Sequence, residues 1–112
     1  MNPAQIDRLR AALPTHIDAR QRRRVDAYAV VAHRCDERIR ALRTDLDRAL
    51  RAVHDAVGSG ARVEPVADEA LRLACELDAL ERIQPRVDAW LRVATGAISD
   101  DPGPEPFGEG PT

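Results

Sequence analysis

Apolar and small residues recur at alternating steps of three and four along two long stretches of the chain. This spacing places them on one face of an α-helix, so it predicts two amphipathic helices. The first stretch holds one register for more than four heptads, and its inward residues are Val25, Tyr28, Ala32, Cys35, Ile39, Leu42, Leu46, Ala49, Val53 and Ala56. The inward residues of the second are Val66, Ala70, Leu73, Leu77, Leu80, Gln84, Val87, Leu91, Ala94 and Ile98. The Gly58-Ser59-Gly60 break between them predicts an all-α fold, an antiparallel helical hairpin similar to a coiled coil.

A short N-terminal helix is expected before the hairpin, over residues 3–13. Asn2 is placed to cap this helix, Pro3 suits the first helical position, and the Gln5 side chain is able to reach back as in a capping box. Pro14 ends the helix because its ring disfavours the helical conformation of the preceding residue.

Similar signals bound the two long helices. Thr15 is expected to cap the first of them, and Gly58 is expected to end it by adopting the left-handed conformation. The expected elements are a long helix over 15–57, a turn over 58–64 and a kinked helix over 65–98.

The kink is expected at Pro85, which cannot donate a backbone hydrogen bond to Glu81. Gln84, directly before it, is the one polar residue at an inward position. Two interpretations stay open, either a hinge or register-setting polar contact, or a kink that neighbouring side chains cover.

The end of the chain differs in composition from the helices. Residues 99–112 are rich in proline and glycine and carry acidic residues without basic ones, so we expect a disordered acidic tail. Residues 1–98 are expected to form a single helical domain.

The predicted core is thin. Hydrophobic residues are 44% of the chain, but many are alanine, and Phe, Trp and Tyr occur once each. Leu71, Ala74 and Cys75 widen the apolar stripe of the second long helix beyond what one partner helix covers. Trp90 flanks the seam and is expected to pack as core. We therefore predict an interface at these four residues, in a homodimeric four-helix bundle or a complex with another helical protein.

Charge is distributed unevenly along the chain. All 17 basic residues are Arg, and the formal net charge is −2. A basic cluster is expected to be exposed at the open end of the hairpin, and it consists of Arg20, Arg22, Arg23 and Arg24. Such a cluster suits phosphate contacts in weak, sequence-independent nucleic-acid binding. Alternatively, the acidic residues of the tail fold back onto it.

The sequence contains no arrangement typical of an active site. His33 and His54 stand three heptads apart, about 31 Å along a helix, so they cannot share a metal within one chain. Gly58-Ser59-Gly60 lacks the lysine and the preceding strand of a phosphate-binding loop. We expect no catalytic residue, no metal site and no cofactor.

The two cysteines bear on the cellular compartment. Cys35 and Cys75 are expected to lie ~18 Å apart along the hairpin, beyond disulfide reach. Both are predicted to be buried thiols in a reducing compartment. Because no apolar run approaches the ~18 residues of a membrane span, a cytoplasmic location without membrane insertion is expected.

Taken together, these patterns predict a non-catalytic protein that acts in interaction, assembly or regulation through helix–helix contacts with itself or a partner protein. The alternative function is a nucleic-acid-associated protein that uses the basic cluster.

Overall fold

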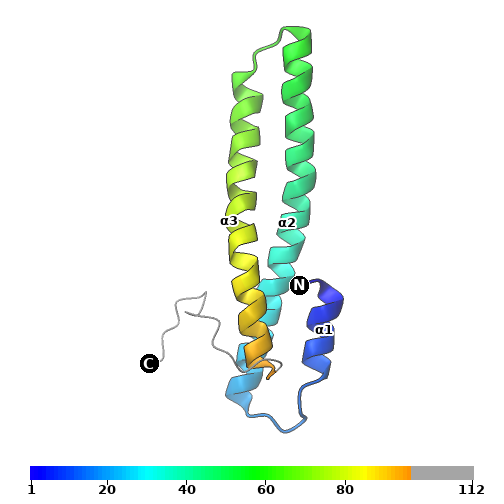
Figure 1. Cartoon of the computed structure of the whole chain (residues 1–112), viewed down its shortest axis with the longest axis vertical. Coiled ribbons are helices and arrows are strands. Elements are labelled where there is room, and N and C mark those ends of the chain that lie inside the picture. The colour runs from blue at the N-terminus through cyan, green and yellow to red at the C-terminus, as the bar shows by residue number, and fades with distance from the viewer. Residues whose placement is uncertain (97–112) are drawn as a thin grey trace, which may run out of the picture. The chain divides into compact units, whose positions relative to one another are not determined.

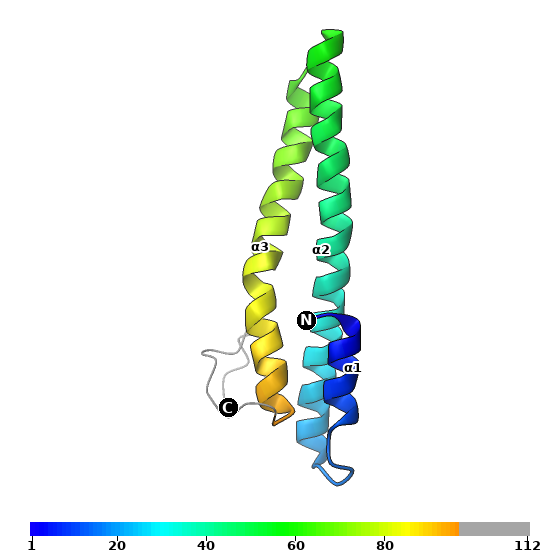
Figure 2. The ribbon, with the colours of Figure 1, turned by 45° about the vertical axis from the view of Figure 1, so that its right-hand side comes forward.

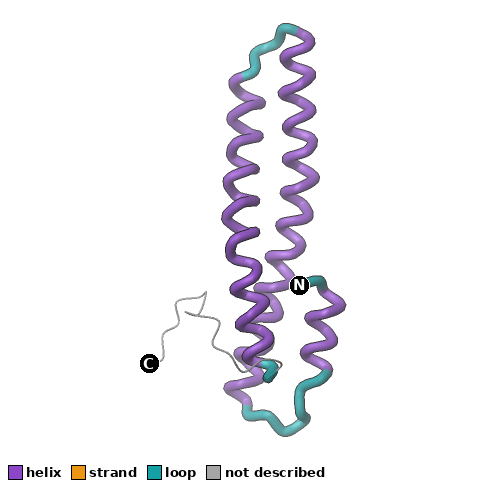
Figure 3. The backbone as a smooth tube through the Cα atoms, in the orientation of Figure 1, coloured by secondary structure: helices purple, strands orange, loops and turns teal. Residues whose placement is uncertain are grey.

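The computed structural model describes residues 1–96, and within them the fold contains three helices and no strand (Figures 1 and 3). The helices are α1 (Pro3–Ala11), α2 (Ala19–Ser59) and α3 (Glu64–Ala94). The two long helices, α2 and α3, pack against each other and run in opposite directions (Figure 1). The predicted all-α hairpin with a short N-terminal helix is confirmed, while the four-helix bundle stays a prediction. The predicted tail, 99–112, lies outside the described residues.

The start of α1 follows the predicted capping box. The Gln5 backbone N–H donates to Asn2 Oδ1 at 2.9 Å, and the Asn2 backbone N–H donates to Gln5 Oε1 at 3.0 Å. The helix ends at Ala11, before the predicted bound at Leu13. The last turn tightens there, since the Leu13 N–H donates to the Arg10 carbonyl, and Pro14 prevents further helix.

The start of α2 differs from the prediction. The helix begins at Ala19 rather than near Thr15, because Asp18 is the residue that caps it. The Gln21 backbone N–H donates to Asp18 Oδ1 at 2.7 Å. A carboxylate satisfies a free N–H of the first turn and also interacts favourably with the positive end of the helix dipole.

The turn between the long helices also differs in detail. Gly58 stays helical, and Gly60 adopts the left-handed conformation with φ +74°. The Ala61 N–H donates to the Ala56 carbonyl at 3.1 Å, which is the hydrogen bond of a Schellman-type helix end. The helix therefore ends at Ser59, and α3 begins at Glu64.

The second long helix is continuous through Pro85, so the helix does not split there. It ends at Ala94, earlier than the predicted Ile98, and Gly96 has φ +78° just beyond it. Gln84 is half-buried, as its inward position predicts. The predicted kink at Pro85 stays a prediction.

The contacts of the chain divide it into two compact units, which are described separately. Unit 1 consists of Met1–Asp36 together with the chain from Arg82 onward, and unit 2 consists of Glu37–Glu81.

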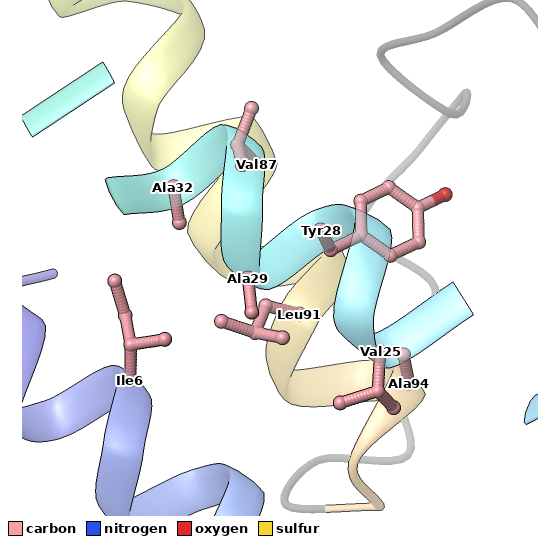
Figure 4. Packing of buried hydrophobic residues seen from close by; sticks show 8 residues of the cluster. All are labelled: Ile6, Val25, Tyr28, Ala29, Ala32, Val87, Leu91 and Ala94. Carbon is pink, nitrogen blue, oxygen red and sulfur yellow. The ribbon is translucent and has the colours of Figure 1, made fainter. Parts of the chain in front are cut away.

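Unit 1 has a three-helix core (Figure 4). Ile6 of α1 is fully buried in a cluster with residues of α2 and α3 (Figure 4), and Leu9 and Leu13 pack against this cluster. Figure 2 shows α1 lying alongside α2. The other buried residues of this core are Val25, Tyr28, Ala29, Ala32, Val87, Leu91 and Ala94. The short helix thus covers the α2–α3 pair within unit 1.

Trp90 packs at the edge of this core, half-buried. This agrees with the prediction that it packs as core. Its ring stacks on the Tyr28 ring, with the ring centroids 6.4 Å apart and the planes 15° from parallel. An aromatic pair in this geometry adds about 0.5–1.5 kcal/mol beyond the area that it buries.

Unit 2 contains only the two long helices, and its core is thinner. Four hydrophobic residues of its cluster are buried, namely Leu42, Ala49, Ala70 and Leu73. The residues packed against them remain half-buried, and these are Leu46, Val53, Leu77 and Leu80. The expectation of a thin core therefore holds in unit 2.

None of the helices in the described range combines the length and the apolar character that crossing a bilayer demands.

Candidate interaction face

The predicted interface residues do not lie together. Leu71 is 64% exposed and Ala74 is half-buried, both on α3 in unit 2. Trp90 belongs to the core of unit 1. Cys75 is an exposed free thiol, so the prediction that it is buried was wrong. It follows Leu73 by two residues, about 200° around the helix, and therefore points away from α2.

Two further exposed aliphatic residues lie on α2 in unit 2. Leu50 is 54% exposed and Val57 is 65% exposed. The sequence interpretation missed them because it assigned the inward register to Ala49 and Ala56, the residues directly before them. A signal was present, since Leu46, Leu50, Val53 and Val57 repeat at steps of four and three and so form a second stripe beside the first.

A salt bridge shows on which side of the hairpin these residues lie. Arg43 of α2 pairs with Glu81 of α3 at 3.3 Å across one edge of unit 2. Residues seven apart share a helix face. Leu50 and Val57 follow Arg43 at seven-residue steps, and Ala74 and Ala67 precede Glu81 at the same steps. The exposed aliphatics of both helices therefore border this edge, and Leu71 lies one turn from each of the two alanines.

The opposite edge of unit 2 is polar. Arg38 pairs there with Glu76 at 2.7 Å. Seven-residue steps from this pair lead to Asp45 on α2 and Glu69 on α3. Hydrogen bonds from Arg72, the closest at 2.6 Å, hold the pKa of the Glu69 carboxyl below its usual value. Exposed aliphatics thus lie on the Arg43–Glu81 side of unit 2, away from the Arg38–Glu76 edge.

We call the first surface the apolar face, and it consists of Leu46, Leu50, Val53 and Val57 on α2 with Ala67, Leu71 and Ala74 on α3. Covering a large aliphatic side chain that is about half exposed contributes about 1 kcal/mol. Leu50, Val57 and Leu71 together therefore offer about 3 kcal/mol to any helix that covers the face. Val30 and Ile83, the remaining exposed large hydrophobics of the described chain, lie in unit 1.

The predicted basic cluster lies at the start of α2 in unit 1, and its four arginines are exposed. Arg20 and Arg24 border an open pocket of about 390 Å³ together with Gln21, whose Nε2 donates to the Ala94 carbonyl at 3.1 Å. Arg22 and Arg23 do not line the pocket. The structure thus places two of the four arginines, together with Asp18, at one concave surface.

A buried ion pair in unit 1 was missed by the sequence interpretation. The Asp88 carboxylate accepts a hydrogen bond from the Met1 ammonium, and both groups are largely shielded from solvent. Local spacing could not reveal this pair, because it says nothing about a partner 87 residues distant. Burial raises the pKa of the Cys35 thiol, and the charge of Asp88 raises it further.

Metal-ligating side chains do not cluster in the part of the chain that the structure describes, where no group of three or more His, Cys, Asp or Glu residues is suited to hold an ion. His33 Nε2 lies 3.5 Å from Asp7 Oδ1, which makes a pair of such side chains.

Comparison of the chain with protein-family models, curated proteins and solved structures found no match. The functional interpretation therefore rests on the two surface features described above, the apolar face of unit 2 and the basic cluster of unit 1.

Proposed function

We propose that this protein is a non-catalytic interaction protein that acts in assembly or regulation by docking the α2–α3 hairpin onto other helices. The observation that carries the proposal is the one-sided exposure of Leu50, Val57 and Leu71 on unit 2. Single exposed leucines are common on protein surfaces, whereas several exposed aliphatic side chains on one side of a hairpin are typical of a surface that a partner covers. Cytoplasmic action is part of the proposal, supported by the two free thiols, Cys35 and Cys75.

The energetics of unit 2 support this function. A two-helix layer buries each helix on one side only, and small helical units gain most of their stability from tertiary packing. A helix laid on the apolar face would convert the two-layer arrangement into a bundle in which the half-buried Leu46 and Val53 are covered as well.

The test is the size of the complex that the protein forms in extracts of the cells that produce it. The double variant Leu50→Glu with Leu71→Glu places two charges on the apolar face and should shift the protein to the elution volume of the free chain. A matched control carries the same charges at exposed alanines elsewhere in unit 2, as Ala41→Glu with Ala79→Glu. The control should elute with the wild type. Elution of the wild type as the free chain would contradict the proposal.

Nucleic-acid association through the basic cluster is the second candidate, and the pocket between Arg20 and Arg24 favours it. Neutralisation of phosphates releases counterions, so the logarithm of the binding constant should fall linearly with the logarithm of salt concentration, by about 0.9 per phosphate contact on duplex DNA. Binding of duplex DNA across a salt series tests this candidate. Loss of binding and of its salt slope in Arg20→Gln with Arg24→Gln would support it, whereas a wild type that does not bind at low salt would exclude it.

A further inference from the structure

We propose that the apolar face binds a second copy of this chain, with the two hairpin tips at the same end and α2 of each copy packed on α3 of the other. This inference rests on the proposed function and names the partner for it. Three observations carry it: the level of the exposed leucines along the hairpin, the shape of the α3 surface, and the charges that border the face.

The register of unit 2 puts Leu50 and Leu71 at the same level. The salt bridges Arg38–Glu76 and Arg43–Glu81 bracket the pairing of residues across the two helices. A partner for Leu50 midway between these two registers is Glu69, which lies two residues, or ~3 Å along the helix, from Leu71. The hairpin therefore carries one exposed leucine on each helix, at nearly the same distance from the tip.

A twofold axis parallel to the two helices suits this arrangement of the two leucines. Rotation about such an axis lays α2 of one copy on α3 of the other and keeps every residue at its own level. Leu50 of each copy then meets the Leu71 region of the other, so one contact is made twice. Every neighbouring pair of helices in the resulting four-helix bundle is antiparallel.

The surface of α3 has the shape that this contact needs. A knob of one helix fits between four residues of the next at positions i, i+3, i+4 and i+7. On α3 these positions are Ala67, Ala70, Leu71 and Ala74, which make a shallow depression with three small residues and one large one. Leu50 of the second copy is the large side chain at this level, and it fills the depression with Leu71 closing over it.

The charges that border the face agree with the same arrangement. Arg43 lies seven residues before Leu50, and Asp78 lies seven residues after Leu71. The rotation that brings Leu50 onto Leu71 therefore also brings Arg43 close to Asp78 of the second copy. A twofold axis perpendicular to the helices would instead pack α3 on α3 of the second copy. With Leu71 at that axis, Asp78 would face the acidic Glu64 of the second copy. Opposite charges favour the first arrangement and like charges oppose the second.

Cysteine crosslinking tests the arrangement in the full chain. The exposed Cys75 is first changed to Ser, and chains with Leu50→Cys are mixed with chains carrying Leu71→Cys and treated with a short bifunctional maleimide. We expect crosslinked dimers in the mixture and none with either variant alone. Crosslinking of Leu50→Cys chains to each other would overturn the arrangement, as would the absence of any crosslinked dimer in the mixture.

Charge reversal gives a second test that does not alter the apolar contact. Either Arg43→Asp or Asp78→Arg alone should raise the dimer dissociation constant roughly tenfold, because it creates two symmetry-related like-charge contacts, one on each side of the twofold axis. Combining the two should restore most of the affinity. Sedimentation velocity measures the constants, and circular dichroism checks that each variant remains helical. Additive losses in the double variant would overturn the pairing.

These experiments separate the inference from the proposed function. A purified chain that is monomeric, yet enters a larger complex in cell extract through Leu50 and Leu71, would overturn self-pairing and leave docking onto another helical protein intact. A chain that stays monomeric in both settings would overturn both.

Discussion

Asp88 of α3 is a carboxylate that the apolar core of unit 1 shields from water, and the Met1 ammonium is its partner. The Asp88 Oδ1 atom accepts no hydrogen bond from the described residues. The ion pair with Met1 therefore provides most of the stabilisation that offsets the desolvation of this charge. The pair links the start of the chain to α3 and so holds α1 next to the hydrophobic core that contains Ile6.

We predict that Asp88→Ala destabilises the fold. The substitution leaves the buried Met1 ammonium without a counterion. Breaking a buried ion pair in this way lowers the free energy of unfolding by about 3 kcal/mol. Urea denaturation monitored by circular dichroism measures the change. The control is Asp47→Ala, which removes an exposed pair with Arg51 and should change the stability by no more than about 0.5 kcal/mol. Equal effects of the two variants would contradict the burial of the Asp88 ion pair.

The two cysteines are predicted to differ in reactivity. Because burial and the Asp88 charge raise the pKa of Cys35, a smaller fraction of this thiol is ionised at any given pH, and access to it is also restricted. Iodoacetamide at pH 8 should modify Cys75 readily and Cys35 only after unfolding, as mass spectrometry of the alkylated peptides will show. Equal modification of the two thiols in the folded protein would contradict the burial of Cys35.

At the scale of the elements, the periodicity of apolar residues predicts the three helices and the hairpin, since a stripe held over many turns leaves little choice of structure. Their ends were less predictable. Thr15 and Asp18 are both good caps, and Gly58 and Gly60 are both able to end a helix, so the local signals are ambiguous. In the structure Asp18 accepts the hydrogen bond of the Gln21 N–H at the start of α2, and Gly60 lets the Ala61 N–H donate to the Ala56 carbonyl at its end.

Alanine substitutions at Gly58 and Gly60, the two glycines near the turn, are predicted to change the stability in opposite directions. Gly60→Ala forces a side chain into the left-handed region at φ +74° and should destabilise the protein by about 1 kcal/mol. Gly58 is helical and has open space around it, so Gly58→Ala should stabilise by up to about 1 kcal/mol. Thermal or urea denaturation of the two variants measures both effects. The reverse order would mean that α2 ends at Gly58, as the sequence alone suggested.

The candidate site was predictable only in part. Leu71 and Ala74 stand out in the sequence because they widen a stripe that is already complete. Leu50 and Val57 were hidden beside the inward Ala49 and Ala56, since a helix with two adjacent apolar stripes does not reveal which stripe faces its partner. The buried partner of Asp88 could not be predicted, because no local pattern connects it to Met1.

At the scale of the whole molecule, the two units differ in how far their cores are complete. Unit 1 has a third helix, and Ile6 of α1 fills its core (Figure 4). Unit 2 has two helices, half-buried leucines and a one-sided apolar face. Helical bundles cover such faces with a third or fourth helix. We infer that association supplies those helices to unit 2.

The most direct test of this account is the mass of the purified protein in solution, measured by light scattering over a range of concentrations. We predict that the wild type, with a chain mass of 12.3 kDa, approaches twice that value as its concentration rises. Leu50→Glu with Leu71→Glu should raise the dissociation constant more than about 100-fold and leave a helical monomer, while Ala41→Glu with Ala79→Glu should dimerise like the wild type. A wild type that stays at the chain mass at every concentration, or a double leucine variant that dimerises equally well, would contradict the account.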